Sequence, residues 1–167
     1  MNGIINVYKE RGYTSHDVVA KLRGILRQKK IGHTGTLDPQ AEGVLPVCLG
    51  NATRLCDLLT DKAQEYEAVL RLGVTPDTQD MTGEILSEAP VSVCEDDIIY
   101  IMSTFKGKIM QIPPMYSALK VGGRKLVDLA REGIEVERKA REIEIYELEI
   151  LEINLPLIRF RVNCSKG

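Results

Sequence analysis

The chain has 167 residues, 44% of them hydrophobic and 28% charged, which is enough for one domain with a hydrophobic core. Its net charge of −2 at pH 7 and its pI of about 5.8 fall short of the basic balance of many nucleic-acid-binding domains, so composition alone indicates no particular partner. The four cysteines form no CxxC pair, which excludes a zinc-finger spacing and a disulfide framework and suits a reducing cytosol. The chain shows no signal segment and no run approaching about 18 apolar residues, so we expect a soluble, cytoplasmic protein with no membrane contact and no metal.

The first third of the chain mixes strand and helix patterns. Thr14 and Asp17 have the spacing of a capping box, and apolar residues then recur at helical spacing from Val18 to Leu26. Cys48 lies in an apolar run and is expected to be a buried thiol. The predicted elements, in chain order, are a strand over residues 3–8, a helix opened by residues 14–17, a loop around Asp38, a strand over residues 44–49 and a helix over residues 52–59.

The rest of the chain also combines both periods. Ser92 and Glu95 suggest a second capping box, and alternation with a slip near Tyr146 indicates a long irregular strand. The predicted elements are a strand over residues 64–72, a turn at 77–83, a helix through Phe105, a turn at 122–123, a helix over 125–131, and strands over 142–153 and 157–162 that pair with each other. Because strands and helices do not alternate regularly, the predicted fold class is α+β.

One carboxylate stands out in residues 32–54, which read GHTGTLDPQAEGVLPVCLGNATR. Pro39 lacks a backbone N–H and biases the residue before it toward extended conformations, so Asp38 is predicted to project from a fixed loop rather than from a helix. Loops of this kind often carry binding and catalytic groups. Most Asp-Pro turns only reverse the chain, however, and the residues alone leave both interpretations open.

Charge and histidine placement add two further open questions. The basic run of Lys21, Arg23, Arg27, Lys29 and Lys30 is either a solvated helix face or an edge that contacts phosphates. His16 and His33 are the only histidines, and they assemble no Ser/His/Asp or Cys/His arrangement. A lone carboxylate near a histidine is compatible with covalent or electrostatic catalysis at a sugar carbon, and equally with no catalysis.

The stretch around Asp38 resembles the catalytic-loop motif of TruB-type tRNA pseudouridine synthases. Residues 66–85, YEAVLRLGVTPDTQDMTGEI, resemble the second motif of that family. Residues 111–133, QIPPMYSALKVGGRKLVDLAREG, resemble the third motif, which belongs to a mobile RNA-gripping insertion, and RVNCSKG resembles the start of the fourth. Because these motifs occur in the family order along the chain, the chain is identified as a member of this family.

The resemblance implies a reaction and a fold. Family members convert uridine 55 in the T-loop of tRNA to pseudouridine: the glycosidic N–C bond breaks, the uracil turns over, and a C–C bond forms from C5. No metal or organic cofactor takes part. The implied fold is the pseudouridine synthase catalytic fold, a mixed and largely antiparallel sheet flanked by helices. The implied partner is the T-stem-loop of tRNA, and we expect a monomer.

The resemblance also implies roles for individual residues. Asp38 matches the essential aspartate, which attacks the ribose C1′ or removes a sugar proton. His33 matches a residue that holds flipped-out T-loop nucleotides, and Tyr66 matches the tyrosine that stacks on the target base. Arg54 occupies a usually basic position near the RNA backbone. Lys120 and Arg124, in the third motif, are candidate phosphate contacts.

Two departures from the family pattern affect these expectations. Val127 stands where the third motif commonly has a tyrosine, and the fourth motif stops at Gly167, before the family's Thr-Tyr-Ile-Arg. We therefore expect residues 1–167 to be the N-terminal part of the catalytic domain, without the arginine that pairs with the catalytic aspartate and without the C-terminal RNA-binding domain, and to have little activity alone. The alternative hypothesis is a non-catalytic RNA-binding or tRNA-folding module. A glycosidase is a weak third hypothesis, because only Glu42 is near Asp38 in sequence as a second carboxylate.

Overall fold

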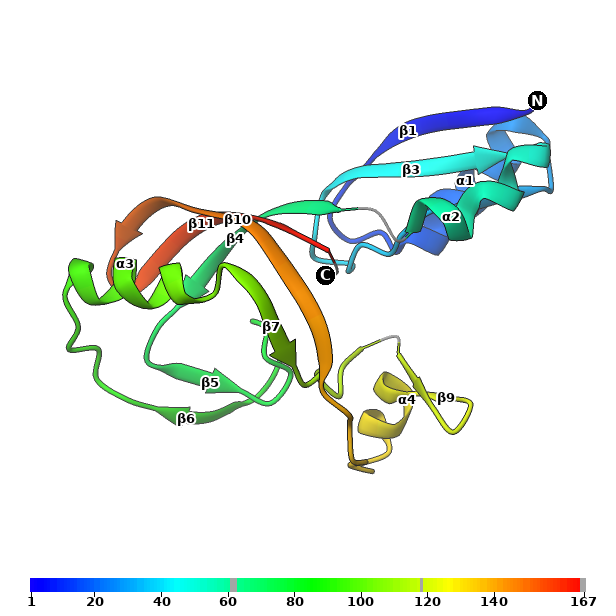
Figure 1. The fold of residues 1–167 in the computed structure, drawn as a ribbon. Helices are drawn as coiled ribbons and strands as arrows, with labels where there is room; N and C mark the ends of the chain where they lie inside the picture. Colours follow the sequence, from blue (N-terminus) through cyan, green and yellow to red (C-terminus); the bar gives the residue numbers. More distant parts are fainter. Residues whose placement is uncertain (61–62, 118, 166–167) are drawn as a thin grey trace. The chain divides into compact units, whose positions relative to one another are not determined.

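The chain divides into two units, Met1–Lys62 and Ala63–Gly167, each of which is described by itself (Figure 1). A computed structural model describes residues 1–60, 63–117 and 119–165. Every strand pairing in these ranges is antiparallel, and helices flank the sheets, so the predicted α+β class with a largely antiparallel sheet is confirmed. The assignment of all 167 residues to one catalytic domain stays a prediction.

In the first unit, a helix covers one face of a small sheet. The strands run in the order β1 (Gly3–Lys9), β3 (Gly43–Leu49) and β2 (Ile31–His33), and the helix is α1 (Ser15–Leu26). Every second residue of β3 points toward α1, since side chains alternate across a strand. Leu45, Val47 and Leu49 are therefore buried against Val18 and Val19 of the helix. This core fixes where the two ends of α1 lie.

The start of α1 is the capping box that the sequence predicted. The Thr14 hydroxyl accepts from the Asp17 N–H at 3.1 Å, and the Asp17 carboxylate accepts from the Thr14 N–H at 2.9 Å. Hydrogen bonds from the Thr14 hydroxyl and N–H lower the pKa of Asp17 below its usual value. The next residue, Ser15, is thereby held as the first residue of the helix.

The predicted helix over residues 52–59 consists of two shorter pieces. A 3₁₀ helix, η1 (Gly50–Leu55), precedes a short α-helix, α2 (Cys56–Thr60). Gly50 has a φ of 58°, and a Cβ there would lie 2.1 Å from Oδ1 of Asn2. The chain can therefore turn sharply into η1 only with glycine at this position.

In the second unit, a helix covers the apolar face of a larger sheet. The strand order is β4 (Gln64–Arg71), β11 (Leu157–Cys164), β10 (Arg141–Asn154) and β7 (Gly107–Gln111). The helix α3 (Glu95–Thr104) contributes Ile98 and Met102, which pack against Ile158. The pairing of β10 with β11 across residues 155–156 confirms the predicted hairpin.

The slip predicted near Tyr146 is a register shift in β10. The pairing with β11 jumps from Ile145 to Glu147, and a second shift between Ile150 and Glu152 was not predicted. Each shift adds a residue to one strand and increases the local twist.

The capping box predicted at Ser92 and Glu95 is wrong. The helix begins at Glu95, and the Asp97 carboxylate accepts from the N–H and the thiol of Cys94 at 3.1 Å and 3.0 Å. Cys94 and Asp97 have the same spacing as the predicted pair, two residues further along the chain. Of the two possible capping pairs at the start of α3, the structure therefore contains the second.

Short hairpins complete the second unit. The predicted turn at residues 77–83 joins β5 (Val74–Pro76) to β6 (Ile85–Glu88), two strands that the sequence did not predict. The predicted glycine turn at residues 122–123 joins β8 (Lys120–Val121) to β9 (Arg124–Lys125), and α4 (Leu126–Arg131) follows.

Candidate functional site

Asp38 lies in the irregular segment between β2 and β3, as Pro39 predicted. The residue is exposed. Its main-chain carbonyl accepts from the Ala41 N–H at 3.0 Å, which closes a turn directly after it. Over residues 1–60, 63–117 and 119–165, the Asp38 carboxylate has no hydrogen-bond or ion-pair partner, so its oxygens are available to a ligand.

Gly12, just before α1, and Ser15, the first residue of α1, hold the Asp38 loop on both sides. Ser15, only 2% exposed, accepts from the Leu37 N–H at 3.0 Å and donates to the Leu37 carbonyl at 3.4 Å. On the other side, the Gly12 N–H donates to the Pro39 carbonyl at 2.8 Å. The two residues that flank Asp38 in the chain are therefore both fixed to one segment, which preorganises the carboxylate.

Lys9 adds a third attachment and is fully buried, with 0% exposure. Its ammonium donates to the carbonyls of Ala41 at 2.6 Å, Tyr13 at 2.8 Å and Glu10 at 3.2 Å. A buried lysine is rare unless its charge is compensated, and three carbonyl dipoles supply that compensation here. Lys9 was not predicted as a site residue, since one lysine at the end of an alternating strand is typical of a solvated face. We call Lys9, Gly12 and Ser15 together the loop clamp.

His33 is the last residue of β2, and its ring meets the ring of His16 edge to face with centroids 6.0 Å apart. His33 Nδ1 is buried and has no hydrogen-bond partner among the described residues. Buried polar nitrogens are normally satisfied, so this atom is a candidate contact for a ligand.

A cavity of about 430 Å³ lies beside β2 and contains both histidines. We call it the β2 groove. It is lined by His16, Val19, Arg23, Lys29, Lys30, Ile31, Gly32, His33, Thr53 and Cys56. Three cations line it, and no carboxylate belongs to its lining among the described residues. The basic run of the sequence thus contributes Arg23, Lys29 and Lys30 to one concave surface.

The side chains of Cys48 and Cys56 contact each other in the first unit. Cys48 is fully buried, as predicted, and burial together with its contact to the Cys56 side chain raises the pKa of Cys48 to about 11. Cys56 is half-buried and lines the β2 groove, where its Sγ would lie 3.2 Å from a Cβ added at Gly32. A larger residue at position 32 would therefore make a tight contact with Cys56, from which the Cys56 side chain would have to shift by a few tenths of an ångström.

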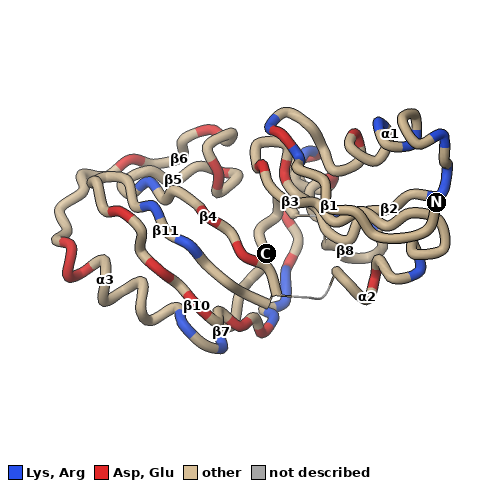
Figure 2. Tube along the Cα trace, turned by 90° about the horizontal axis from the view of Figure 1, so that it is seen from above, with Lys and Arg blue, Asp and Glu red and all other residues tan. Residues whose placement is uncertain are grey.

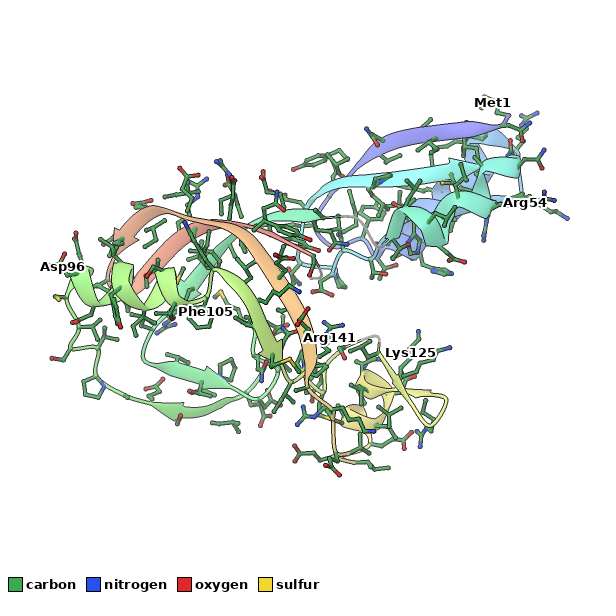
Figure 3. All side chains as sticks on the ribbon, viewed as in Figure 1. Met1, Arg54, Asp96, Phe105, Lys125 and Arg141 are labelled. Carbon is green, nitrogen blue, oxygen red and sulfur yellow. The ribbon has the colours of Figure 1, made fainter. Side chains whose placement is uncertain are left out.

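The remaining predicted site residues lie in different places. Arg54 is exposed on η1 of the first unit (Figure 3). Tyr66 is half-buried on β4 of the second unit, where its hydroxyl bonds the side chain of Gln64. Asp38, His33 and Arg54 all belong to the first unit, in the loop after β2, at the end of β2 and on η1 respectively, whereas Tyr66 belongs to the other unit.

Neighbouring strands of the larger sheet carry opposite charges: Figure 2 shows acidic residues on β4 and β10 and basic residues on β11 between them. Glu67 accepts from Arg159 and from Arg161, each at 2.9 Å, and Arg161 also donates to Glu149 at 3.0 Å. Hydrogen bonds from Arg161 and then Arg159 lower the pKa of Glu67. These ion pairs are exposed and join neighbouring strands, so we interpret them as contacts that favour the strand register and not as a ligand-binding site.

The candidate phosphate contacts of the third motif line a second basic cavity of about 680 Å³ in the second unit. Lys120 and Arg124 come from β8 and β9, and Lys125 and Arg131 extend the surface. Arg124 pairs with Glu132, which also lines the cavity, so this surface has mixed charge.

Comparison with known proteins identifies the class. Residues 23–167 match the family described as TruB family pseudouridylate synthase (N terminal domain). The chain therefore belongs to the TruB family.

Relatives agree with this membership. The chain is 53% identical to a tRNA pseudouridine synthase B of Clostridium tetani over 168 residues, and 60% identical to one of Lachnoclostridium phytofermentans over 176 residues. All of this chain is covered in both cases, but only 58% and 57% of the two relatives, so the chain spans little more than half of their length.

Solved structures share the fold. A chain of a Cbf5-Nop10-Gar1 complex superposes with a TM-score of 0.74 and 37% identity, covering 99% of this chain and 40% of that chain. A chain of an H/ACA RNP bound to a substrate RNA containing 2'-deoxyuridine superposes with a TM-score of 0.69 and 33% identity, covering 99% and 38%. Among the described residues of our chain, no helix has the length and apolar character needed to cross a membrane.

Proposed function

We propose that this chain is part of a tRNA pseudouridine(55) synthase, an isomerase that converts uridine 55 in the T-loop of tRNA to pseudouridine. The observation that carries the proposal is the clamped Asp38 loop in a chain of the TruB family: an exposed carboxylate without a partner among the described residues, held through Leu37, Pro39 and Ala41. Rigid placement of one carboxylate suits a reaction at a single sugar carbon.

The proposed reaction balances without a cofactor. The N1–C1′ bond of uridine breaks, the uracil turns over, and a C5–C1′ bond forms. The hydrogen on C5 leaves as a proton and N1 takes up a proton, so nothing is oxidised or reduced. Asp38 either attacks C1′ or removes a proton from the sugar, and both roles need its ionised, accessible oxygens.

Three further residues have proposed roles in holding the RNA. His33 holds flipped-out T-loop nucleotides, for which its buried Nδ1, unpartnered within the part of the chain that the structure describes, is suited. Arg54, exposed on η1, contacts the RNA backbone. Tyr66 stacks on the target base, a contact generally worth about 1–3 kcal/mol per base. The base must leave its stack before its glycosidic carbon can be reached.

The proposed partner is the T-stem-loop of tRNA, bound by a monomer in the cytoplasm. The bacterial relatives are named for their action on tRNA, and the cations of the β2 groove suit an RNA backbone.

The test is Asp38→Asn in the full-length protein, with the exposed Asp57→Asn as a matched control. We expect Asp38→Asn to lower pseudouridine formation by about 10⁴-fold or more, as loss of a single catalytic residue does in other enzymes. The assay is tritium release from tRNA labelled at C5 of uridine. Binding of the tRNA should persist, and Asp57→Asn should leave both properties unchanged.

The same variant distinguishes the alternative function, a non-catalytic module, from the proposed isomerase activity. A non-catalytic RNA-binding or tRNA-folding module needs no carboxylate at Asp38, so tritium release would be absent before the substitution and binding would be unchanged after it. Full activity of Asp38→Asn would refute the proposed mechanism.

A further inference from the structure

Two thiols of the first unit lie side by side, and one of them lines the β2 groove. Cys48 on β3 is fully buried, whereas Cys56 at the start of α2 is half-buried. We propose that Cys56 is a thiol–disulfide exchange site for anionic low-molecular-weight disulfides, and that Cys48 is the resolving thiol that completes an internal Cys48–Cys56 disulfide. This inference goes beyond the proposed function and does not rest on it.

The backbone brings the two thiols together beside a glycine. Gly32 on β2 pairs with Cys48 on β3, and side chains of directly paired residues lie on the same face of a sheet. A Cβ at Gly32 would lie 3.2 Å from Sγ of Cys56, so Cys56 covers this face next to Cys48. The two cysteine side chains are in contact. Contact between the side chains is the first requirement of a disulfide, which joins sulfurs about 2.05 Å apart.

The surroundings of the two thiols differ, and so do their proposed roles. Burial and contact with Cys56 raise the pKa of Cys48 to about 11, so Cys48 is rarely a thiolate at neutral pH. Cys48 is also 0% exposed, which keeps an external disulfide away from it. Cys56 faces a groove of about 430 Å³, a volume typical of cavities that hold small molecules. Cys56 is therefore the thiol that meets a small disulfide first.

The charge of the groove favours an anionic disulfide. Arg23, Lys29 and Lys30 line it, and no carboxylate does so within the described part of the chain. The Arg23 guanidinium is held by a hydrogen bond to the Ile31 carbonyl at 3.3 Å, while the two lysines are exposed. A disulfide whose ends carry carboxylates can place them on these cations while its S–S bond reaches Cys56.

The exchange consists of two balanced steps. The Cys56 thiolate attacks one sulfur of the small disulfide, a mixed disulfide forms on Cys56, and the other half leaves as a thiolate that takes up the proton lost by Cys56. Cys48 then gives up its proton and attacks Sγ of Cys56, so the internal disulfide forms and the second half leaves as a thiol. The two cysteines lose two electrons, and the small disulfide gains them. Contact offsets the low thiolate fraction of Cys48, since well-oriented intramolecular reactions reach effective molarities of about 10⁵ M or more.

Tryptic digestion makes the product readable by mass spectrometry. Cleavage after Lys and Arg places Cys48 in residues 31–54 and Cys56 in residues 55–62. After the full-length protein is treated with about 1 mM oxidised glutathione near pH 8, we expect a disulfide between these two peptides, in a protein that migrates as a single chain on a non-reducing gel. Free thiols in both peptides, a glutathione adduct that persists on Cys56, or a disulfide between two copies would overturn the proposal.

Cystamine tests the choice of an anionic disulfide, because it exchanges by the same chemistry but carries two ammonium groups. Cys94 is the internal reference, since its thiol donates to the Asp97 carboxylate at 3.0 Å in an acidic first turn. The ratio of initial modification rates, Cys56 over Cys94, should be about tenfold higher with oxidised glutathione than with cystamine. An equal ratio for the two reagents would overturn the choice.

A pair of double variants assigns this preference to the groove. Lys29→Gln/Lys30→Gln should lower the preference for oxidised glutathione at Cys56 about threefold or more, because two of the three cations are lost. The matched control, Lys125→Gln/Lys139→Gln, removes exposed lysines of the other unit and should leave the preference unchanged. An equal loss in both double variants would overturn the assignment, because it would reveal an effect of overall charge.

Substitution of each thiol tests its role. In Cys48→Ala, the glutathione adduct on Cys56 should form and persist, because no resolving thiol remains; Cys48→Val repeats the measurement with the buried volume restored. In Cys56→Ser, Cys48 should stay reduced, because it is buried. Glutathionylation of Cys48 in Cys56→Ser at the rate of Cys94 would overturn the order of attack. None of these measurements involves RNA, so their failure leaves the proposed isomerase activity untouched.

Discussion

Lys9→Met tests whether the loop clamp holds the Asp38 loop. Methionine keeps the length and the apolar stem of the lysine and removes only the ammonium group. The substitution therefore leaves the carbonyls of Ala41, Tyr13 and Glu10 without their common donor. Because Lys9 is fully buried, water does not reach its site without a change in the surrounding chain.

The size of the effect follows from the three bonds. Those to Ala41 and Tyr13, at 2.6 Å and 2.8 Å, have the short length of charge-assisted bonds and should each contribute about 1.5–3 kcal/mol. The 3.2 Å bond to Glu10, an exposed residue, counts for little because that carbonyl can turn to water. Removing a buried charge recovers part of its desolvation cost, so we expect a net loss of about 3 kcal/mol.

Amide hydrogen exchange measures this loss where it occurs. A loss of about 3 kcal/mol should accelerate exchange of the Gly12 and Leu37 amides by about a hundredfold, since about 1.4 kcal/mol corresponds to tenfold. The Leu72 amide, which bonds the Pro156 carbonyl in the second unit, is an internal reference and should not change. The exposed Lys106→Met is the matched variant. If Gly12 and Leu37 exchange at the unchanged rate in Lys9→Met, the ammonium does not hold the loop and the reasoning fails.

Three further predictions concern the loop, a turn and the thiols. Ser15→Ala in the full-length protein should lower single-turnover pseudouridine formation about tenfold with RNA affinity unchanged, because only the orientation of the Asp38 loop is relaxed; a parallel loss of affinity would contradict this. Thr82 and Thr78 donate to the Asp80 carboxylate and lower its pKa. The ionised carboxylate therefore stabilises the folded chain at pH values above the pKa of Asp80 in the unfolded chain, and this stabilisation is lost as the pH falls through the pKa of Asp80 in the folded chain. The chemical shift of the Thr82 amide in NMR should titrate with a midpoint below pH 3.8. At pH 8, N-ethylmaleimide should modify exposed Cys94 and spare buried Cys48, whose pKa is raised to about 11. Mass spectrometry of the folded chain measures this, and modification of Cys48 at the rate of Cys94 would contradict the prediction.

Local sequence patterns predicted the longer elements well because the signals for those elements, a capping pair and a regular alternation, lie within the elements themselves. The capping box of Thr14 and Asp17 starts α1, and the alternation with a slip near Tyr146 appears as the shifted register of β10. Short elements were missed, since β2 has only three residues and periodicity needs more. Two equivalent capping spacings lay side by side at Cys94, and the sequence offered no means to choose between them.

The candidate site was predictable only where its signal is local. Asp38 could be placed in a loop from Pro39 alone. The partners of that loop are remote in sequence: Lys9 reaches a carbonyl 32 residues away, and Ser15 one 22 residues away. A lysine in an alternating strand and a serine after a cap both have ordinary explanations, so their role emerges only from the contacts. The same holds for the β2 groove, where three of the five residues of the basic run lie beside histidines from two elements.

A single helix links the two halves of the candidate site. The first residue of α1, Ser15, fixes the Asp38 loop, and Arg23 in its last turn lines the β2 groove. Val19, between them, is 3% exposed and belongs both to the core and to the groove lining. Because close-packed cores transmit displacement rather than absorb it, the core contacts of Val19 set the position of both ends of the helix together. The geometry of the proposed catalyst and that of the β2 groove therefore depend on the same few buried contacts, and α1 acts as their common support.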